Sequence, residues 1–210
     1  MPLGAGPERC VLATKSFTAK LAVLLRTAYA LAGKPESGGA LVHAAADDIE
    51  RLLADDRRAH IRQIAQRLQR HEHLFVLGRG VSYPLALEAA LKVKEVSYLH
   101  AEGFAGGELK HGVIALIEPG TPCLVLAPPD ETQADMLSGA MEVKARGAML
   151  IGISPEPHEM FDEHIAVADL GPATAIVNTV PAQLLAYDLA LLRGHDPDKP
   201  RNLAKSVTVK

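Results

Sequence analysis

The sequence predicts an α/β fold, in which a doubly wound parallel sheet flanked by helices follows an all-helical N-terminal segment. From residue 73 onward, short apolar runs of strand length alternate with helical patterns. These runs lack the apolar–polar alternation of half-exposed strands, which is typical of parallel strands covered on both faces. No strand pattern precedes residue 73. In such a sheet, we expect ligands beyond the carboxyl ends of the strands.

The helical front consists of three amphipathic patterns, at residues 14–32, 41–54 and 57–70. Residues 34–39 contain proline and glycine and predict a loop. The front has no strands of its own to cover. We therefore expect it to pack against the sheet domain or against a further part of the protein.

The sheet domain alternates strands and helices. The predicted loop at 100–112 is long, rich in glycine and charged, which is often a sign of function. The tail, 194–210, has two prolines and little helical pattern. We divide the chain into a helical remnant and linker (1–66), the sheet domain (67–193) and the tail (194–210). The predicted strands are 73–77, 123–127, 149–153 and 164–167, and the predicted helices are 84–96, 131–146 and 176–192.

The composition is that of an ordinary globular protein. Of its 210 residues, 48% are hydrophobic and 22% are charged. A net charge of −3 gives no basic footprint for nucleic acid or an anionic membrane. We find no signal pattern and expect no run of membrane-spanning length. With only two cysteines and no disulfide framework, a cytoplasmic protein is expected.

A glycine-flanked turn, Gly78-Arg79-Gly80, links the first strand to a nearly apolar helix. Free amides at such a turn, together with the positive end of the helix, can bind an anionic ligand. A tight turn with no ligand is the alternative, and the spacing does not decide between them.

Three charges fall on one stripe of that helix, namely Glu88, Lys92 and Glu95. An ion-paired stripe facing solvent is one interpretation, since Glu88 and Lys92 have the spacing of a pair. The other is a cleft that holds a carboxylate beside an ammonium group, because buried charges are costly unless paired. The histidines do not cluster as metal ligands, so we expect no metal site.

Three stretches resemble a known family. They are LEAALKVKEVSYLHAEGFAGGELKHG (87–112), LVLAP (124–128) and DKPRNLAKSVTVK (198–210). They are similar to the isomerase half of the glucosamine-6-phosphate synthases, which contains two sugar isomerase (SIS) domains. The resemblance covers nearly the whole chain. Residues from about 71 resemble the second SIS domain, and the front resembles the end of the first.

The resemblance implies conversion of fructose 6-phosphate and ammonia to glucosamine 6-phosphate, without a metal or cofactor. Glu95 would move a proton between C1 and C2, and Lys92 would tune that carboxylate. His111, contributed by the neighbouring subunit of a homodimer, would help to open the sugar ring. Lys205 would form an imine with the C2 carbonyl. These types suit the chemistry of proton transfer and imine formation.

The resemblance also implies backbone contacts to the sugar at Val11 and Ala204. Gly78, Gly80 and Ser82 are the nearest candidates for holding a phosphate. In the family, however, the catalytic phosphate lies in the first SIS domain.

The glutaminase domain and most of the first SIS domain have no counterpart in this sequence. We therefore expect weak or no turnover by this chain alone, unless a partner chain supplies them. Two alternatives remain open. One is an SIS-type glucosamine-6-phosphate deaminase, and the other is a non-catalytic module that binds sugar phosphates.

Overall fold

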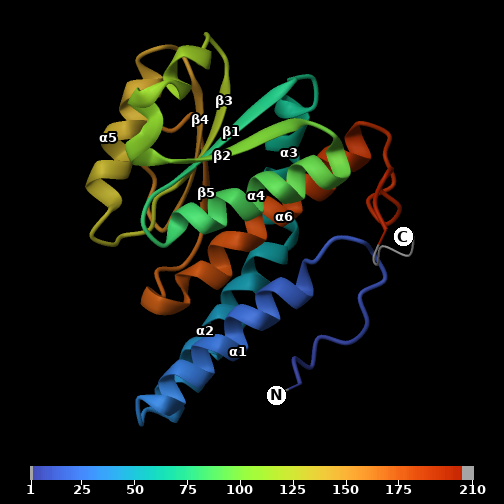
Figure 1. Ribbon diagram of the computed structural model, residues 1–210, viewed down its shortest axis with the longest axis vertical. Helices are drawn as coiled ribbons and strands as arrows, with labels where there is room; N and C mark the ends of the chain where they lie inside the picture. Colours follow the sequence, from blue (N-terminus) through green and yellow to red (C-terminus); the bar gives the residue numbers. More distant parts are fainter. Residues whose placement is uncertain (1, 205–210) are drawn as a thin grey trace.

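A five-stranded parallel sheet forms the centre of the protein. The computed structural model describes residues 2–204. The strands lie in the order β2-β1-β3-β4-β5, and every neighbouring pair is parallel (Figure 1). From β1 the chain moves to one side to form β2, and then crosses back over β1 to form β3 on the other side. The topological switch point therefore lies between β1 and β3. The strands are β1 (His73–Gly78), β2 (His100–Ala105), β3 (Pro122–Leu126), β4 (Met149–Ser154) and β5 (Glu163–Ala166).

Helices cover both faces of the sheet, which confirms the doubly wound prediction. Leu124 and Leu126 of β3 belong to one hydrophobic cluster, and Cys123 and Val125 belong to another. Successive side chains of a strand point to opposite faces, so these clusters are the two sides of the sheet. One side is covered by α3 (Asp55–Leu68), α4 (Ser82–Ser97) and α6 (Thr174–Leu192), and the other by α5 (Gln133–Lys144) and the short helices η1 (Gly106–His111) and η2 (Val113–Leu116).

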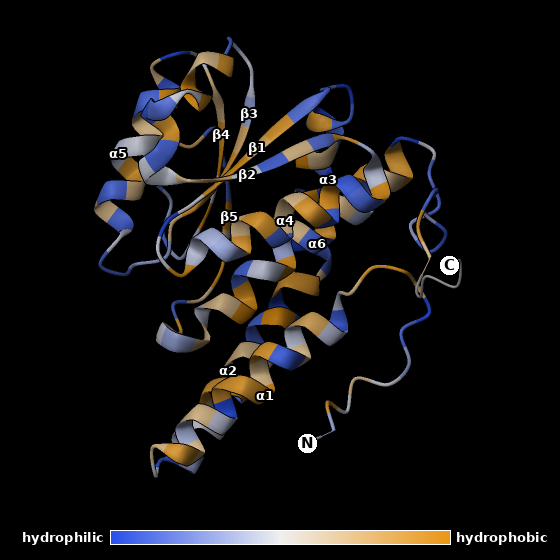
Figure 2. Cartoon of the chain, in the orientation of Figure 1, coloured by the Kyte–Doolittle hydropathy of each residue, from blue (hydrophilic) through white to orange (hydrophobic). Residues whose placement is uncertain are grey.

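The most apolar helix, α6, runs through the middle of the larger cluster (Figure 2). The segment Gly171–Leu192 has the length and apolar composition of a membrane-spanning helix. The expectation of no run of membrane-spanning length was therefore wrong. However, 67% of the qualifying window is buried inside the protein. A buried core helix meets the same criteria as a membrane span.

The helical front packs against the sheet domain, which is the first of the two arrangements that the sequence predicted. The helices α1 (Lys15–Leu31) and α2 (Pro35–Leu53) lie side by side and contact α6 (Figure 1). Buried Asp48 of α2 accepts a hydrogen bond from the Ala168 amide at 2.9 Å. Arg58 of α3 forms a bidentate ion pair with the buried carboxylate of Asp188 in α6. The distance from Arg58 Nη2 to Asp188 Oδ1 is 2.7 Å.

The predicted loop at 34–39 was wrong, because α2 already begins at Pro35. Proline is tolerated in the first turn, where its missing N–H has no helical partner. Gly38 is buried, and an added Cβ would lie 2.6 Å from the Cβ of Tyr29 in α1. Gly38 thus allows α1 and α2 to approach closely, so it marks helix contact and not a break.

The predicted loop at 100–112 was also wrong in its first half, which forms the edge strand β2. Along its whole length β2 pairs with β1. Its Gly103 passes over α4 so closely that an added Cβ would lie 2.8 Å from the Ala86 carbonyl oxygen. The rest of the segment forms η1.

Candidate functional site

Three of the four charged residues of α4, namely Glu88, Lys92 and Glu95, form one ion-paired group. Lys92 Nζ lies 2.7 Å from Glu95 Oε2 and 3.4 Å from Glu88 Oε1. The side chain of Lys92 is 3% exposed, while those of Glu88 and Glu95 are 15% and 19% exposed. The group is therefore not the solvent-facing stripe that was one interpretation. It is a largely buried arrangement of one ammonium between two carboxylates.

The contact from Lys92 to Glu95 lacks the angles of a hydrogen bond, so Glu95 Oε2 is a buried acceptor held by charge alone. A carboxylate with an unused lone pair beside an ammonium can take up a proton. The helix fixes the two charged groups one turn apart. Removing either group would leave the other as a buried, unpaired charge, which is strongly destabilising.

The N-terminal stretch and the C-terminal tail contact each other (Figure 1). Cys10 Sγ donates a hydrogen bond to the Pro197 carbonyl at 2.9 Å. Gln183 of α6 donates to the Thr14 carbonyl at 3.4 Å. Val11 lies between these two attachment points in the sequence. The contact between Cys10 and Pro197 joins segments 187 positions apart in the sequence, and the backbone roles of Val11 and Ala204 stay predictions.

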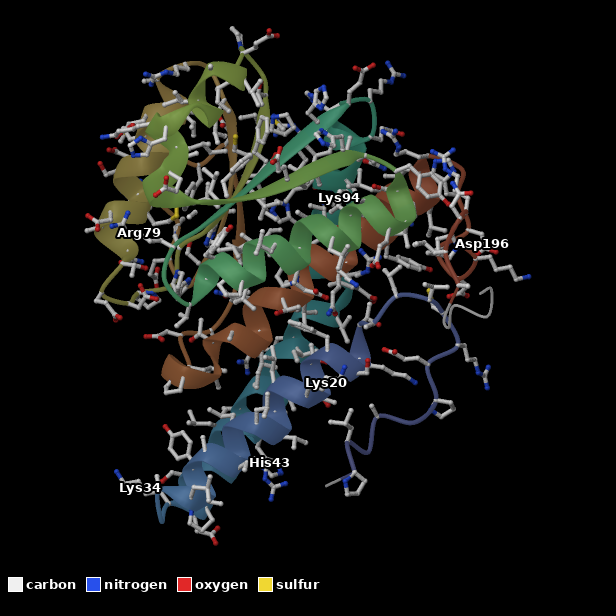
Figure 3. All side chains as sticks on the ribbon, in the orientation of Figure 1. Lys20, Lys34, His43, Arg79, Lys94 and Asp196 are labelled. Carbon is white, nitrogen blue, oxygen red and sulfur yellow. The ribbon has the colours of Figure 1, made fainter. Side chains whose placement is uncertain are left out.

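Tyr98, which directly follows α4, holds the tail. Its hydroxyl accepts a hydrogen bond from the Arg201 amide at 2.7 Å, and the Arg201 guanidinium lies 4.1 Å from the ring centroid. The ring of His195 packs against Tyr98 with 4.5 Å between centroids. Figure 3 labels Lys94 on α4 and Asp196 on the C-terminal tail. Ala204 is exposed at the end of this segment, and Lys205 lies outside the described residues.

His111 is not brought to Glu95 within one chain. It is exposed at the end of η1, and the neighbouring Leu109 is buried in the cluster on the α5 side of the sheet. Glu95 lies on α4, which covers the opposite side. Any joint action of His111 and Glu95 therefore requires two subunits.

The Gly78–Gly80 turn is explained by packing as well as by a ligand. A Cβ on Gly78 would lie 2.3 Å from the Ser82 carbonyl oxygen, and Gly80 has a φ of +55°. Only glycine is free of penalty in such a backbone. Arg79 points toward α5 and pairs with Asp135 at 2.9 Å (Figure 3). Of the three predicted phosphate contacts, only Ser82 lines a pocket at the switch point.

Comparison with known proteins identifies the family. Residues 67–193 match the SIS domain. The chain belongs to the SIS domain family. Relatives named glutamine–fructose-6-phosphate aminotransferase (isomerizing) are 44% identical in Pyrococcus horikoshii over 98% of this chain, and 46% identical in Bacillus subtilis over 99% of it. This confirms the resemblance. The chain spans 35% of the length of these relatives.

Solved structures agree with this membership in the SIS family. The C-terminal domain of glucosamine-fructose-6-phosphate aminotransferase from Francisella tularensis is 32% identical, with a TM-score of 0.79 over 94% of this chain and 58% of that one. A glucosamine-6-phosphate deaminase from Thermotoga maritima is 28% identical, with a TM-score of 0.75 over 96% of this chain and 59% of that one.

Sequence reasoning missed two residues of this SIS chain. The first is Tyr98, which the sequence analysis includes only within the stretch 87–112. The structure gives it a left-handed φ of +58°, which is uncommon for a bulky residue. The second is Asn178, which lies inside an apolar helix. A side-chain amide in such a helix indicates a buried polar site. Among residues 2–204, no group of three or more metal-ligating side chains gathers.

Proposed function

We propose that this chain is the isomerase portion of a glucosamine-6-phosphate synthase, which converts fructose 6-phosphate and ammonia to glucosamine 6-phosphate. The observation that supports it most directly is the buried Lys92–Glu95 pair at 2.7 Å, on a helix whose end holds the C-terminal tail. The relatives named as aminotransferases of this type support the same reaction. They favour it over the deaminase alternative, whose solved representative is less similar.

In this proposal the tail brings Lys205 to the open-chain sugar, where its amine condenses with the C2 carbonyl and water leaves. Ammonia then displaces the lysine amine, which leaves an imine at C2. Glu95 takes a proton from C1 and returns one to C2, so that C1 becomes the aldehyde and C2 carries the amine. Lys92 holds the Glu95 carboxylate in position, because the two charged groups lie 2.7 Å apart on the same helix.

The remaining roles need more than one chain. We propose a cytoplasmic homodimer in which His111 of one subunit opens the sugar ring at the Glu95 of the other. The position of His111 on the opposite side of the sheet supports this division of labour. Residues 1–66 would be the end of a first SIS domain, whose remainder would supply the phosphate contacts, and a glutaminase unit would supply ammonia. Val11 and Ala204 would present backbone groups to the sugar.

The test is to follow by NMR, in D₂O with ammonia, deuterium exchange at C1 of fructose 6-phosphate and deuterium incorporation at C2 of the glucosamine 6-phosphate that forms. It is run with a first SIS domain supplied as a separate chain. Removing a general base lowers the rate by about 10²- to 10⁴-fold, which we expect for Glu95→Gln. Lys94→Met, an exposed change on the same helix, is the control. Exchange that is equally fast in Glu95→Gln, or no exchange by the unaltered chain, contradicts the proposal.

A further inference from the structure

A pocket of about 500 Å³ opens at the topological switch point, away from Lys92 and Glu95. It lies between the amino ends of α4 and α6 and the segment that follows β3. Its apolar walls come from residues such as Val81, Leu85 and Pro172. Pockets of parallel sheets form at this place because adjacent connections leave the sheet in opposite directions.

Two buried side chains in this pocket have no hydrogen-bond partner. Ser82 is 1% exposed and its Oγ is unpaired. Asn178 is 2% exposed, and neither its Oδ1 nor its Nδ2 is paired. Leaving a buried polar group without a hydrogen bond destabilises a protein, so natural proteins rarely keep three such atoms without a use. These atoms supply at least two donors and two acceptors to a bound molecule.

The acidic lining of the pocket disfavours phosphate, against the attraction that the amino ends of α4 and α6 offer an anion. Three acidic residues line it, namely Asp130, Glu131 and Asp169, and its lining includes no lysine, arginine or histidine. The nearest basic residue of the adjoining turn, Arg79, is paired with Asp135 on α5. Like charges at such short range disfavour an anion. The expectation that Ser82 and the glycine turn hold a sugar phosphate stays a prediction, and neither Gly78 nor Gly80 lines this pocket.

We propose that this pocket binds an amino sugar that carries no phosphate. Ser82 and Asn178 would bond its hydroxyl groups, the acidic rim would attract its ammonium group, and the apolar walls would contact the C–H faces of its ring. Most small-molecule sites combine apolar walls with a few such convergent polar groups. This site does not depend on the proposed reaction at Glu95.

The test is NMR titration of the full chain with glucosamine, N-acetylglucosamine and inorganic phosphate. We expect glucosamine to shift the Asn178 side-chain signals saturably at millimolar concentration. N-acetylglucosamine, which lacks the positive charge, should bind more weakly, and phosphate should leave these signals unchanged. Asn178→Leu should weaken glucosamine binding about tenfold, since each lost hydrogen bond contributes about 0.5–1.5 kcal/mol.

A stability measurement separates a binding role from a structural one. Asn178→Leu removes unsatisfied polar atoms, so its melting temperature should match or exceed that of the unaltered chain while binding falls. Ser82→Ala should weaken binding about threefold with the fold intact, and Lys94→Met should bind glucosamine normally. The proposal is overturned if glucosamine causes no saturable shift, if phosphate shifts the same signals, or if both pocket variants bind glucosamine as well as Lys94→Met.

Discussion

The Tyr98 hydroxyl accepts the backbone N–H of Arg201 at 2.7 Å, which ties the end of α4 to the C-terminal tail across 103 residues of sequence. The Arg201 guanidinium lies over the same ring, and His195 packs beside it. Glu95 lies in the last turn of α4, three residues before Tyr98. In the proposed mechanism the tail carries Lys205, so Tyr98 would align the two parts of the proposed site.

Replacing Tyr98 by asparagine should release the tail and leave the core intact. Asparagine tolerates the left-handed backbone at this position, so the change removes the ring with little strain. The lost hydrogen bond and cation–π contact together contribute about 1–2 kcal/mol to docking. Hydrogen exchange of the Arg201 amide should therefore accelerate, whereas amides of β3 should not change. Tyr98→Phe keeps the ring and should have an intermediate effect. Unchanged exchange at Arg201 would contradict this role.

The thiol of Cys10 should report the position of the tail. It donates a hydrogen bond to the Pro197 carbonyl and is only partly buried. In Tyr98→Asn, a loss of about 1 kcal/mol in docking should speed its alkylation by about fivefold. Cys123 is the internal control, because complete burial raises the pKa of its thiol to about 12 and keeps it unreactive in the folded protein. Labelling of Cys10 at the same rate in both proteins would count against this coupling.

Tail docking should weaken in acid. Burial lowers the pKa of His195 below its ordinary value of 6.5, and the positive charges of Arg193 and Arg201 lower it further. The docked tail thus favours the neutral ring, and its contribution is complete above about pH 6.5. It is lost as pH falls through the lowered pKa, because the free tail then binds a proton more readily. Exchange of the Arg201 amide, corrected for its intrinsic pH dependence, should rise between pH 7.5 and 5. His195→Gln should abolish this acid-dependent rise in the exchange rate of Arg201. The same pH response in the variant would refute the role of His195.

Local patterns predicted the elements that lie within the core, and failed where a distant neighbour decides the conformation. The runs at β1, β3 and β4 are continuously apolar because they are covered on both faces. In contrast, β2 contains His100, Glu102 and Gly103, which look like a loop until pairing with β1 supplies their hydrogen bonds. Parallel pairing is non-local, so no short pattern reveals it.

The site divides in the same way. The spacing of Lys92 and Glu95 is a property of one helix, and the structure places the two charges within 2.7 Å. The clamp of Tyr98 on Arg201 joins two segments that share no pattern, and the unpaired Asn178 becomes visible only once its surroundings are known. Only the resemblance pointed to His111 and Lys205.

Adjacent glycines in α2 should respond oppositely to alanine. At Gly38 the added Cβ would lie 2.6 Å from Tyr29 Cβ, so Gly38→Ala should destabilise the protein by about 1–3 kcal/mol through forced separation of α1 and α2. At Gly39 nothing lies within 4 Å, and Gly39→Ala should stabilise the helix by about 0.5–1 kcal/mol. Urea unfolding measures both. Equal changes in the two variants would show that α1 and α2 are not in close contact in solution.

Removing the Lys92 ammonium should destabilise the fold far more than removing its exposed neighbour. Lys92→Met leaves two largely buried carboxylates facing each other without a cation. Breaking a buried pair in this way costs about 3 kcal/mol, at the lower end of the usual range because both carboxylates retain some contact with water. Lys94→Met, two residues along the helix and exposed, should change stability by less than about 0.5 kcal/mol. The free energy of unfolding in urea at pH 7 measures the difference. If the two variants were equally stable, Lys92 would not be holding the Glu88 and Glu95 carboxylates in place, and the ion-paired group could not serve as a preorganised proton-transfer site.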